Sequence, residues 1–260
     1  MFEVVTERLS RPGFDMAYHL APWDRETVGE TAAIASLTLH DPGAAADAWP
    51  AFPDWCAERG VVLVSARLAH RQVAECGFLE ARGFRFIELN YRPATTRLSD
   101  FVADPEVAVQ DAASSDRDAI RAIAAETFGD GRFHADPMVG PAIGNRRYTA
   151  WADRAFGNPA QRVIKAVVGG RIAGFMVVET PSAAARFWSL VGLAPGLGGQ
   201  GLGRRIWRTV LARHAAEGVT EVSTSISSHN HAALNLYVAL GFRFPEPSTT
   251  LHWCPKGPLT

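Results

Sequence analysis

Two stretches of the chain repeat one pattern of apolar and polar positions at an offset of 158 residues. FLEARGFRFIE (78–88) and LYVALGFRFPE (236–246) share six of eleven positions. In each copy an amphipathic stretch ends at a glycine, Gly83 or Gly241, which suits the left-handed residue that closes a helix. Strand-like runs flank the copies at 60–68 and 84–92, and at 218–226 and 242–253. The pattern predicts a strand–helix–strand unit twice; chance similarity of two amphipathic helices is the alternative.

The hydrophobic pattern between the two copies predicts further elements. A polar segment with two prolines, 92–106, reads as a linker. Beyond it, Ile120, Ile123 and Ala124 recur at helical spacing, with Ser and Asp cap candidates ahead of them. The predicted elements are a strand (107–110), a helix (111–128), a loop with a short helix (129–157), a hairpin with a Gly-Gly turn (162–179) and a strand that stops at proline (184–195).

Composition narrows the class of protein without naming its chemistry. A length of 260 residues suits two domains, and a net charge of −1 argues against a nucleic-acid binder driven by bulk charge. Cys56, Cys76 and Cys254 are scattered and odd in number, so we expect no metal site and a reducing, cytoplasmic setting. The charged N-terminus does not resemble a signal peptide, and no apolar run reaches the ~20 residues of a membrane span. We expect a soluble protein with no membrane partner.

A glycine-dense loop leads into a helix within 193–218, LAPGLGGQGLGRRIWRTVLARHAAEG. Glycines let backbone amides approach a ligand closely, and a helix start adds unpaired N–H groups that suit a phosphate. The loop lacks the Gly-Lys-Ser/Thr of a Walker A motif and the spacing of a Rossmann motif. Taken alone, a flexible surface loop and an anion site are both open.

A second constellation decides between these two interpretations. NHAALNLYVALGF (230–242) has the pattern Asn-x-x-Ala-x-x-Leu-Tyr-x-x-x-Gly-Phe. Together with the preceding strand and glycine loop, it resembles the GNAT superfamily of acyl-CoA N-acyltransferases over about residues 106 to 254. The resemblance implies an α/β (α+β) fold with a mixed central sheet, and acetyl-CoA as cosubstrate without a metal.

The resemblance also implies a role for particular residues. The backbone of Val191 and Leu193 would pair with the pantetheine arm, with the Val191 N–H near the thioester carbonyl. Asn230 and Leu236 would contact the cosubstrate. Tyr237 would protonate the departing thiolate, a step that is uphill by roughly 2 kcal/mol in water; a half-buried tyrosine that only packs its ring is the alternative. The loop residues that would hold the pyrophosphate are Gly198, Gly199, Gln200, Gly201, Leu202 and Gly203.

Two features depart from the family pattern. Gly198 stands where the family loop usually begins with Arg or Gln, so a side-chain contact is lost, which Gln200 could partly replace. The stretch 185–193 has no carboxylate, although many relatives carry a glutamate general base there. Glu179 is a weak candidate for that base, and a solvated charge at the end of a strand is the simpler interpretation.

The first half of the chain lacks the glycine loop and has Leu79 at the position of Tyr237. We therefore expect a degenerate, truncated GNAT-like domain (1–98), an acetyltransferase domain (99–260) and one active site. Further stretches along the chain are WDRETVG (23–29), GFRFIELNYRP (83–93), GRFHADP (131–137), RRYTAWADRAF (146–156) and STTLHW (248–253). This layout resembles that of dTDP-fucosamine acetyltransferases, which implies a nucleotide-linked amino sugar as acceptor.

Acceptor candidates come from 131–151. The candidates that cluster there are Arg132, His134, Asp136, Arg147 and Tyr148. The arginines and the tyrosine could grip a nucleotide diphosphate and stack a base; a surface loop with scattered charges is equally open, and His134 could be a structural histidine. Another small amine, amino acid, antibiotic or peptide would fit the same chemistry, and a non-catalytic acyl-CoA-binding protein is an alternative of another class. The sequence leaves room for a homodimer.

Overall fold

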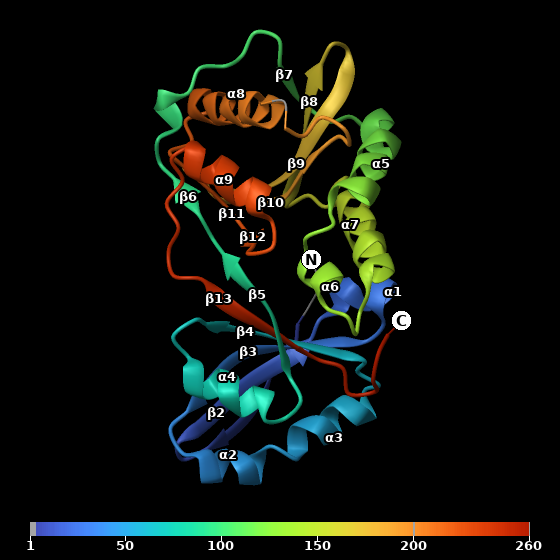
Figure 1. Cartoon of the computed structure of the whole chain (residues 1–260), viewed down its shortest axis with the longest axis vertical. Coiled ribbons are helices and arrows are strands. Elements are labelled where there is room, and N and C mark those ends of the chain that lie inside the picture. The colour runs from blue at the N-terminus through green and yellow to red at the C-terminus, as the bar shows by residue number, and fades with distance from the viewer. Residues whose placement is uncertain (1–3, 200, 260) are drawn as a thin grey trace. The chain divides into compact units, whose positions relative to one another are not determined.

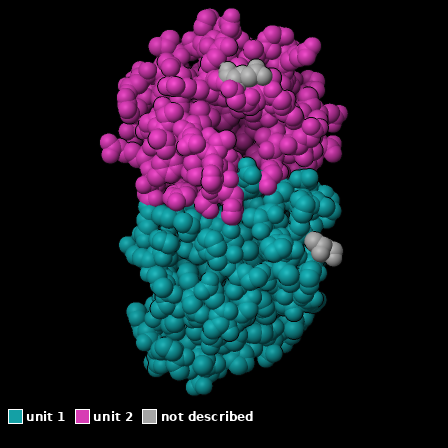
Figure 2. Space-filling view, in the orientation of Figure 1, with its two compact units in different colours: residues 1–90, 130–147, 246–260 teal, residues 91–129, 148–245 magenta. Residues whose placement is uncertain are grey.

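The computed structural model describes residues 4–199 and 201–259 (Figure 1). By packing, the chain divides into two compact units, and neither is one continuous stretch (Figure 2). Unit 1 comprises 1–90, 130–147 and 246–260, and unit 2 comprises 91–129 and 148–245. The predicted domains, 1–98 and 99–260, follow the repeat in the sequence and stay a prediction.

Unit 1 contains a mixed sheet. Among the strand pairs that the structure describes in it, β3 and β4 are parallel, and β1–β2, β2–β3, β4–β13 and β13–β5 are antiparallel. In sheet order its strands are β1 (Glu7–Arg11), β2 (Phe14–Leu20), β3 (Thr31–Leu39), β4 (Leu63–Ala69), β13 (Ser248–Trp253) and β5 (Arg85–Tyr91). The strand after the second copy of the repeat thus lies between the two strands of the first copy. The sequence predicted that strand but not its partners.

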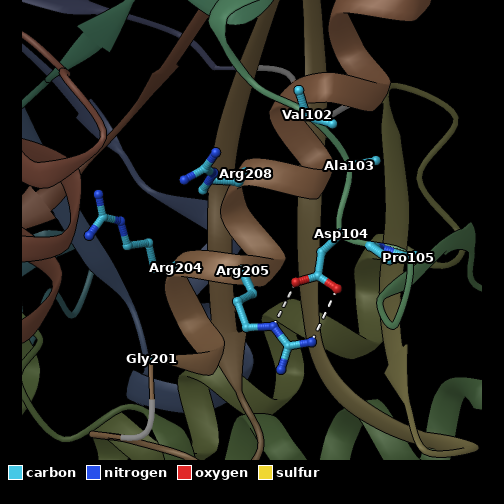
Figure 3. Close-up of a pocket in the computed structure, with 8 residues that line it drawn as sticks. All are labelled: Val102, Ala103, Asp104, Pro105, Gly201, Arg204, Arg205 and Arg208. Atoms are coloured by element: carbon cyan, nitrogen blue, oxygen red, sulfur yellow. Dashed lines mark hydrogen bonds and ion pairs between the residues drawn. The ribbon is translucent and has the colours of Figure 1, made fainter.

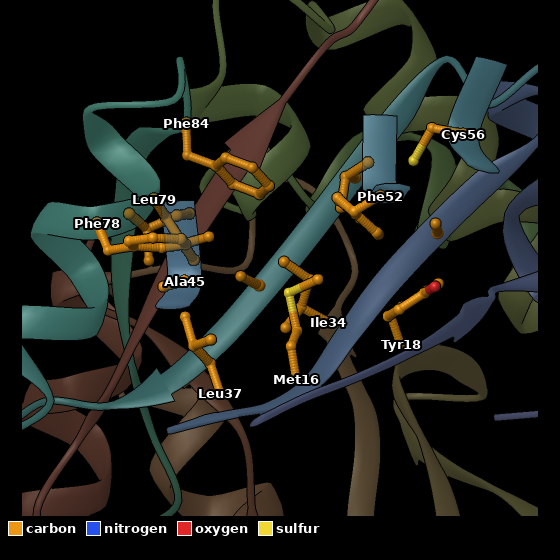
Figure 4. Close-up of a cluster of buried hydrophobic side chains, with 14 of the residues drawn as sticks. Met16, Tyr18, Ile34, Leu37, Ala45, Phe52, Cys56, Phe78, Leu79 and Phe84 are labelled. Carbon is orange, nitrogen blue, oxygen red and sulfur yellow. The ribbon is translucent and has the colours of Figure 1, made fainter. Parts of the chain in front are cut away.

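Helices bury the apolar face of this sheet. Phe14, Met16 and Tyr18 alternate along β2 and are all buried, as expected of a strand with one covered face. They join Phe52 and Phe78 in one cluster, part of which is shown in Figure 4. The helices of unit 1 are η1 (Pro22–Asp24), α1 (Arg25–Val28), α2 (Pro42–Ala48), α3 (Ala51–Glu58), α4 (Val73–Glu80) and α6 (Arg132–Ala135).

The buried carboxylate of Asp136 holds the segment 130–147 within unit 1. The Asp136 carboxylate is fully buried and accepts hydrogen bonds from Arg85 (3.1 Å) and the Met138 N–H (2.9 Å), and it pairs with His252 Nδ1 (2.8 Å). Burial alone would raise the pKa of Asp136, but the hydrogen bonds from His252 and Met138 lower it. Each donor therefore stabilises a charge that water does not reach.

Unit 2 contains the second mixed sheet. Among its described strand pairs, β10 and β11 are parallel and the others are antiparallel. In sheet order its strands are β6 (Ala94–Thr95), β11 (Glu221–Thr224), β10 (Ala185–Leu193), β9 (Arg171–Ser182), β8 (Gln161–Val168) and β7 (Ala108–Asp111). The remaining elements are η2 (Leu98–Asp100), η3 (Ser114–Asp116), α5 (Arg117–Thr127), α8 (Leu202–Ala216), β12 (Ile226–Ser227) and α9 (His231–Ala239).

Most of the predicted elements of unit 2 are present. Ile120, Ile123 and Ala124 form the buried face of α5, and Gly169 and Gly170 turn the β8–β9 hairpin with positive φ. The length of one helix differs from the prediction, because the predicted loop with a short helix (129–157) contains the long helix α7 (Pro141–Ala155). Its residues up to 147 belong to unit 1 and those from 148 belong to unit 2. The predicted linker packs into unit 2 at Leu98, which is buried.

The mixed α/β class expected from the sequence is confirmed. Across residues 4–199 and 201–259, no helix combines the length and apolarity that crossing a membrane requires. The same residues contain no group of three or more His, Cys, Asp or Glu side chains arranged to hold a metal ion.

Candidate active site

The strands β10 and β11 form a fork in unit 2. They pair in parallel only from Ala185 and Glu221 as far as Trp188 and Thr224. There the Thr224 hydroxyl donates to the Trp188 carbonyl at 2.8 Å, and β11 ends while β10 continues to Leu193. The last part of β10 therefore has a neighbouring strand, β9, on one edge and none from β11 on the other.

A β-bulge sets which backbone groups face the open edge. Trp188 pairs with Val178 of β9, but Leu190 pairs with Val177, so Ser189 is an extra residue in the ladder. Further along, the Ala194 N–H donates to the Ala173 carbonyl at 2.9 Å. Because the bonds of an antiparallel ladder alternate, the backbone groups of Val191 and Leu193 point away from β9. These are the two residues predicted to pair with a pantetheine arm.

One of those backbone groups already has a partner. The Thr127 hydroxyl, in the last turn of α5, lies 2.7 Å from the carbonyls of both Leu193 and Ile123, and its single proton is shared between these two acceptors. The N–H and C=O of Val191 and the N–H of Leu193 remain oriented towards the open edge. An extended chain with amide groups could add to this edge as another strand would.

The glycine loop after β10 uses the conformations that glycine allows. Gly196, Gly199 and Gly201 have φ of 78°, 77° and 74°, which other residues rarely adopt. Gly201 is the N-cap of α8, so the first N–H groups of the helix open onto the loop. Gly198 is exposed with open space around it, and Gln200 lies outside the described residues.

Gly203 and Leu202 continue the loop into the first turn of α8. A Cβ atom on Gly203 would lie 2.8 Å from Leu193 Cδ1, so the helix start packs closely against the end of β10. Leu236 of α9 also approaches this glycine, with its Cδ2 at 3.7 Å from the same point. Strand, loop and both helices therefore meet at one place.

A pocket of about 500 Å³ adjoins the first turns of α8 (Figure 3). Arg205 is neutralised there, because it donates to Asp104 at 2.7 and 3.1 Å and to Glu106. Arg204 and Arg208 line the same pocket, are exposed, and form no ion pair with any residue that the structure describes. The family motifs do not include these two arginines, although their positions four residues apart after the glycine loop are a usable signal in the sequence.

Asn230 and Tyr237 belong to α9. The Asn230 side chain caps the helix by accepting from the Ala233 N–H at 2.9 Å. Tyr237 is only 2% exposed, and its ring meets Phe242 edge to face at 4.7 Å between centroids. Its hydroxyl lies near Thr224, the last paired residue of β11. Tyr237 is thus directed at the point where the fork opens.

Burial raises the pKa of the Tyr237 hydroxyl to about 12, although the Trp207 indole and the Thr224 hydroxyl partly offset that rise. The Trp207 N–H is itself buried and makes no hydrogen bond of good geometry with a described residue, so its effect on the Tyr237 hydroxyl is electrostatic. At neutral pH the Tyr237 hydroxyl is protonated and is a proton donor.

The acceptor candidates fall in different units. Arg132 of unit 1 lies 3.7 Å from Asp24, and its side chain is 18% exposed. His134 of the same unit meets Asn145 Oδ1 through Nε2 at 2.9 Å. Tyr148 belongs to unit 2 and stacks on Phe128 at 4.5 Å between centroids. Their role in acceptor binding stays a prediction.

Glu179, the weak candidate for a general base, lies in β9 opposite Phe187 of β10. Its carboxylate accepts a hydrogen bond from the Gln161 side chain at 2.9 Å. Glu179 is half-buried and lies three residues before the end of β9, and its part as a base stays a prediction.

Comparison with known proteins agrees with this geometry. The sequence profile of the acetyltransferase (GNAT) family matches residues 119–242, a range that contains the fork, the glycine loop and α9. The chain has a GNAT acetyltransferase fold. No curated protein sequence matches it significantly.

Solved structures with the GNAT fold resemble nearly the whole chain. A GCN5-related N-acetyltransferase from Sphaerobacter thermophilus has a TM-score of 0.65 at 16% identity, over 92% of this chain and 76% of that one. A tandem GNAT protein of the clavulanic acid biosynthesis pathway has a TM-score of 0.57 at 15% identity, over 93% and 79%. A glucosamine N-acetyltransferase region of a fungal β-N-acetylglucosaminidase has a TM-score of 0.64 at 12% identity, over 92% and 31%. At these identities the likeness concerns the fold.

Proposed function

We propose that the protein transfers an acetyl group from acetyl-CoA to the nitrogen of a small-molecule amine. The observation that carries this proposal is the fork of unit 2. There the free edge of β10, the start of α8 and the Tyr237 hydroxyl converge within one compact unit. Such a fork could bind acetyl-CoA, which carries a thioester at one end of an amide-containing arm and phosphates at the other end.

Each part of the cosubstrate has a proposed partner. The loop amides from Gly198 to Gly203 hold the pyrophosphate, and Arg204 and Arg208 supply positive charge beside it. The edge groups of Val191 and Leu193 pair with the amides of the pantetheine arm. In this proposal Asn230, at the start of α9, and Leu236 both contact the cosubstrate, and the Leu236 contact is apolar.

The reaction proceeds by direct attack. The amine nitrogen forms a bond to the thioester carbon, and the carbonyl electrons move onto oxygen, where the Val191 N–H stabilises the negative charge. The intermediate then collapses, the C–S bond breaks, and Tyr237 gives its proton to the leaving sulfur. The proton that the nitrogen loses goes to water or to a general base, a role to which this proposal assigns no residue.

Burial of Tyr237 raises the free-energy cost of transferring its proton to the leaving thiolate. A hydroxyl of pKa about 12 and a thiol of about 8.5 differ by roughly 5 kcal/mol in water, more than for an unperturbed tyrosine. Desolvation also disfavours a thiolate and narrows the gap. Proton transfer concerted with C–S cleavage fits these values better than transfer to a fully formed thiolate.

For the acceptor we propose a nucleotide-linked amino sugar. The support is the diffuse resemblance to dTDP-fucosamine acetyltransferases, together with cationic and aromatic side chains at Arg132, His134 and Tyr148. A fungal region of similar fold is described as a glucosamine N-acetyltransferase. Another small amine would leave the chemistry unchanged.

A non-catalytic acyl-CoA-binding protein is the second candidate function. Two observations favour it: the described part of β10 carries no carboxylate, and Tyr237 is deeply buried. Thiol release from acetyl-CoA, measured over a panel of amines beside a separate measurement of coenzyme A affinity, distinguishes the two. Amine-dependent release supports the enzyme, and tight binding without release by any amine supports the binder.

A further inference from the structure

Trp188 occupies the last paired position of β10 before the fork. Its side chain is the largest among those that are fully buried. Its backbone carbonyl accepts from Thr224 across the fork, and the next residue, Ser189, is the bulge that reorients the ladder. The conformation of this one residue therefore affects both strands of the fork.

The Trp188 ring also packs beside the proposed general acid. Its centroid lies 6.4 Å from that of Tyr237 and 6.2 Å from that of Phe242, while those two rings contact each other at 4.7 Å. In such a close-packed group, a rotation of the indole moves the tyrosine ring as well.

A buried histidine fixes the orientation of the indole. The Trp188 N–H donates to Nε2 of His214, in the last turn of α8, at 3.1 Å, and both side chains are fully buried. Because Nε2 is the acceptor, a neutral ring carries its proton on Nδ1, which faces Glu217 Oε2 at 3.3 Å. Burial lowers the pKa of His214 to about 4, which keeps the ring neutral at physiological pH.

Two arginines in turn hold the carboxylate of Glu217. Arg162 of β8 donates to it at 2.9 Å and Arg213 of α8 at 3.0 Å, and both arginines also bind Asp111 of β7. Burial alone would raise the pKa of Glu217, but the hydrogen bonds from Arg162 and His214 bring it to about 2. His214 is thus linked through charged side chains to β8 and β7, the last two strands of the sheet of unit 2.

We propose that His214 is a positioning residue of the active site: it orients the Trp188 indole, and through it the bulge of β10 and the Tyr237 ring. This inference rests on the proposed function, since it assigns His214 a part in the same acetyl transfer. His214 itself touches neither cosubstrate nor acceptor. Its effect reaches the chemistry only through Trp188.

The test is a double-mutant cycle on thiol release from acetyl-CoA. His214→Leu removes the acceptor of the indole N–H and leaves that donor buried and unpaired. Trp188→Phe removes the donor and keeps an aromatic ring beside Tyr237. We expect each single variant to lower kcat by about 10- to 100-fold, because small displacements at a reacting centre are costly. We expect the double variant to be no slower than the singles, with the KM for acetyl-CoA little changed throughout.

Conservative and control variants separate positioning from loss of stability. In His214→Gln a carboxamide oxygen can accept from the indole, so kcat should recover most of the loss. Val210→Ala, on the buried face of the same helix, should lower the melting temperature and leave kcat unchanged.

Three outcomes would overturn the role of His214 while the wild-type chain releases thiol. The fold-losses in kcat of the two single variants could multiply in the double variant. The kcat of His214→Gln could stay as low as that of His214→Leu, or the kcat of His214→Leu could equal that of the wild type. Failure of the proposed function looks different, because the wild-type chain itself would then release no thiol with any amine, and the role of His214 would fall with it.

Discussion

Burial decides what Tyr237 can contribute. The same ring could be a packing residue of α9, because it is 2% exposed and meets Phe242 edge to face. The position of its hydroxyl beside Thr224, where the fork opens, is what distinguishes it from an ordinary core tyrosine.

Replacement of Tyr237 by Phe keeps the ring and removes the proton. We expect thiol release to fall on the order of 100-fold, the lower range of general acid catalysis, with coenzyme A affinity little changed. Tyr18→Phe is the matched control, because Tyr18 is also a buried tyrosine with a pKa raised by burial but lies in unit 1. Full activity of Tyr237→Phe would remove the tyrosine from the mechanism.

The arginines of the α8 pocket should act on binding and not on turnover. Arg204→Gln with Arg208→Gln removes two charges that have no ion-pair partner within the described chain. We expect coenzyme A to bind about tenfold more weakly, with a smaller dependence on salt. Arg205→Gln is the contrasting variant, because its partners Asp104 and Glu106 would be left unpaired and stability should fall. Calorimetric titration measures the first effect; equal affinity before and after the change would exclude a phosphate contact.

Two buried histidines make stability depend on pH. Burial lowers the pKa of His214 and of His252 from 6.5 to about 4. Below pH 6.5 the unfolded chain binds a proton at each, while the folded chain does not until about pH 4, so stability is complete above pH 6.5 and is lost as the pH falls. At pH 5 the loss is about 2 kcal/mol per histidine.

Urea unfolding at pH 7.5 and pH 5 measures this loss. His214→Gln should show roughly half of the wild-type difference, because only His252 then remains. A free energy of unfolding that is the same at both pH values would mean that these rings are not buried and neutral in solution.

At the scale of elements, the fork depends on the close approach of β9 and β10. A Cβ atom on Gly174 of β9 would lie 2.8 Å from the Gly192 carbonyl oxygen, a backbone atom that cannot rotate away. We expect Gly174→Ala to destabilise the chain by roughly 1–3 kcal/mol and to lower activity by displacing β10. Gly129→Ala is the control, because nothing lies within 4 Å of that position; equal melting temperatures for the two variants would contradict the packing described.

Elements with a local signal could be predicted from the sequence. Gly83 and Gly241 close their helices with φ of 88° and 75°, and the Gly-Gly turn forms, because glycine alone adopts these torsions without strain. The sequence predicts mostly a loop where the helix α7 lies, because Pro141, Gly144 and Asn145 are residues of low helix propensity. The roles of Asn230 as a cap and of Arg204 as a pocket residue depend on three-dimensional surroundings that the motif does not encode.

At the scale of the whole molecule, the repeat predicts two similar halves but not the exchange of a strand between them. β13 follows the second copy, yet it pairs with β4 and β5 of the first, about 160 to 190 residues earlier. Leu251 of this strand is fully buried in the core of unit 1. Periodicity identifies a strand and its buried face but not a partner so distant in sequence.

The strand exchange predicts that the N-terminal half does not fold alone. A fragment of residues 1–98 lacks β13, which is the partner of β5 within the described sheet of unit 1. We expect the fragment to show no cooperative thermal transition by circular dichroism, and a synthetic peptide of residues 246–258 to restore one in part. A sharp transition of the fragment by itself would show that the half is an independent domain.

The central claim, acetyl transfer at the fork of unit 2, is tested most directly by thiol release from acetyl-CoA. Wild-type protein and Tyr237→Phe would be compared over amino sugar nucleotides, free amino sugars, amino acids, polyamines and aminoglycosides. We predict amine-dependent release by the wild-type chain, greatest with a nucleotide-linked amino sugar and strongly reduced in Tyr237→Phe. Release with another amine would change the identity of the acceptor and leave the proposed mechanism unchanged. Tight coenzyme A binding with no release from any amine would contradict the claim.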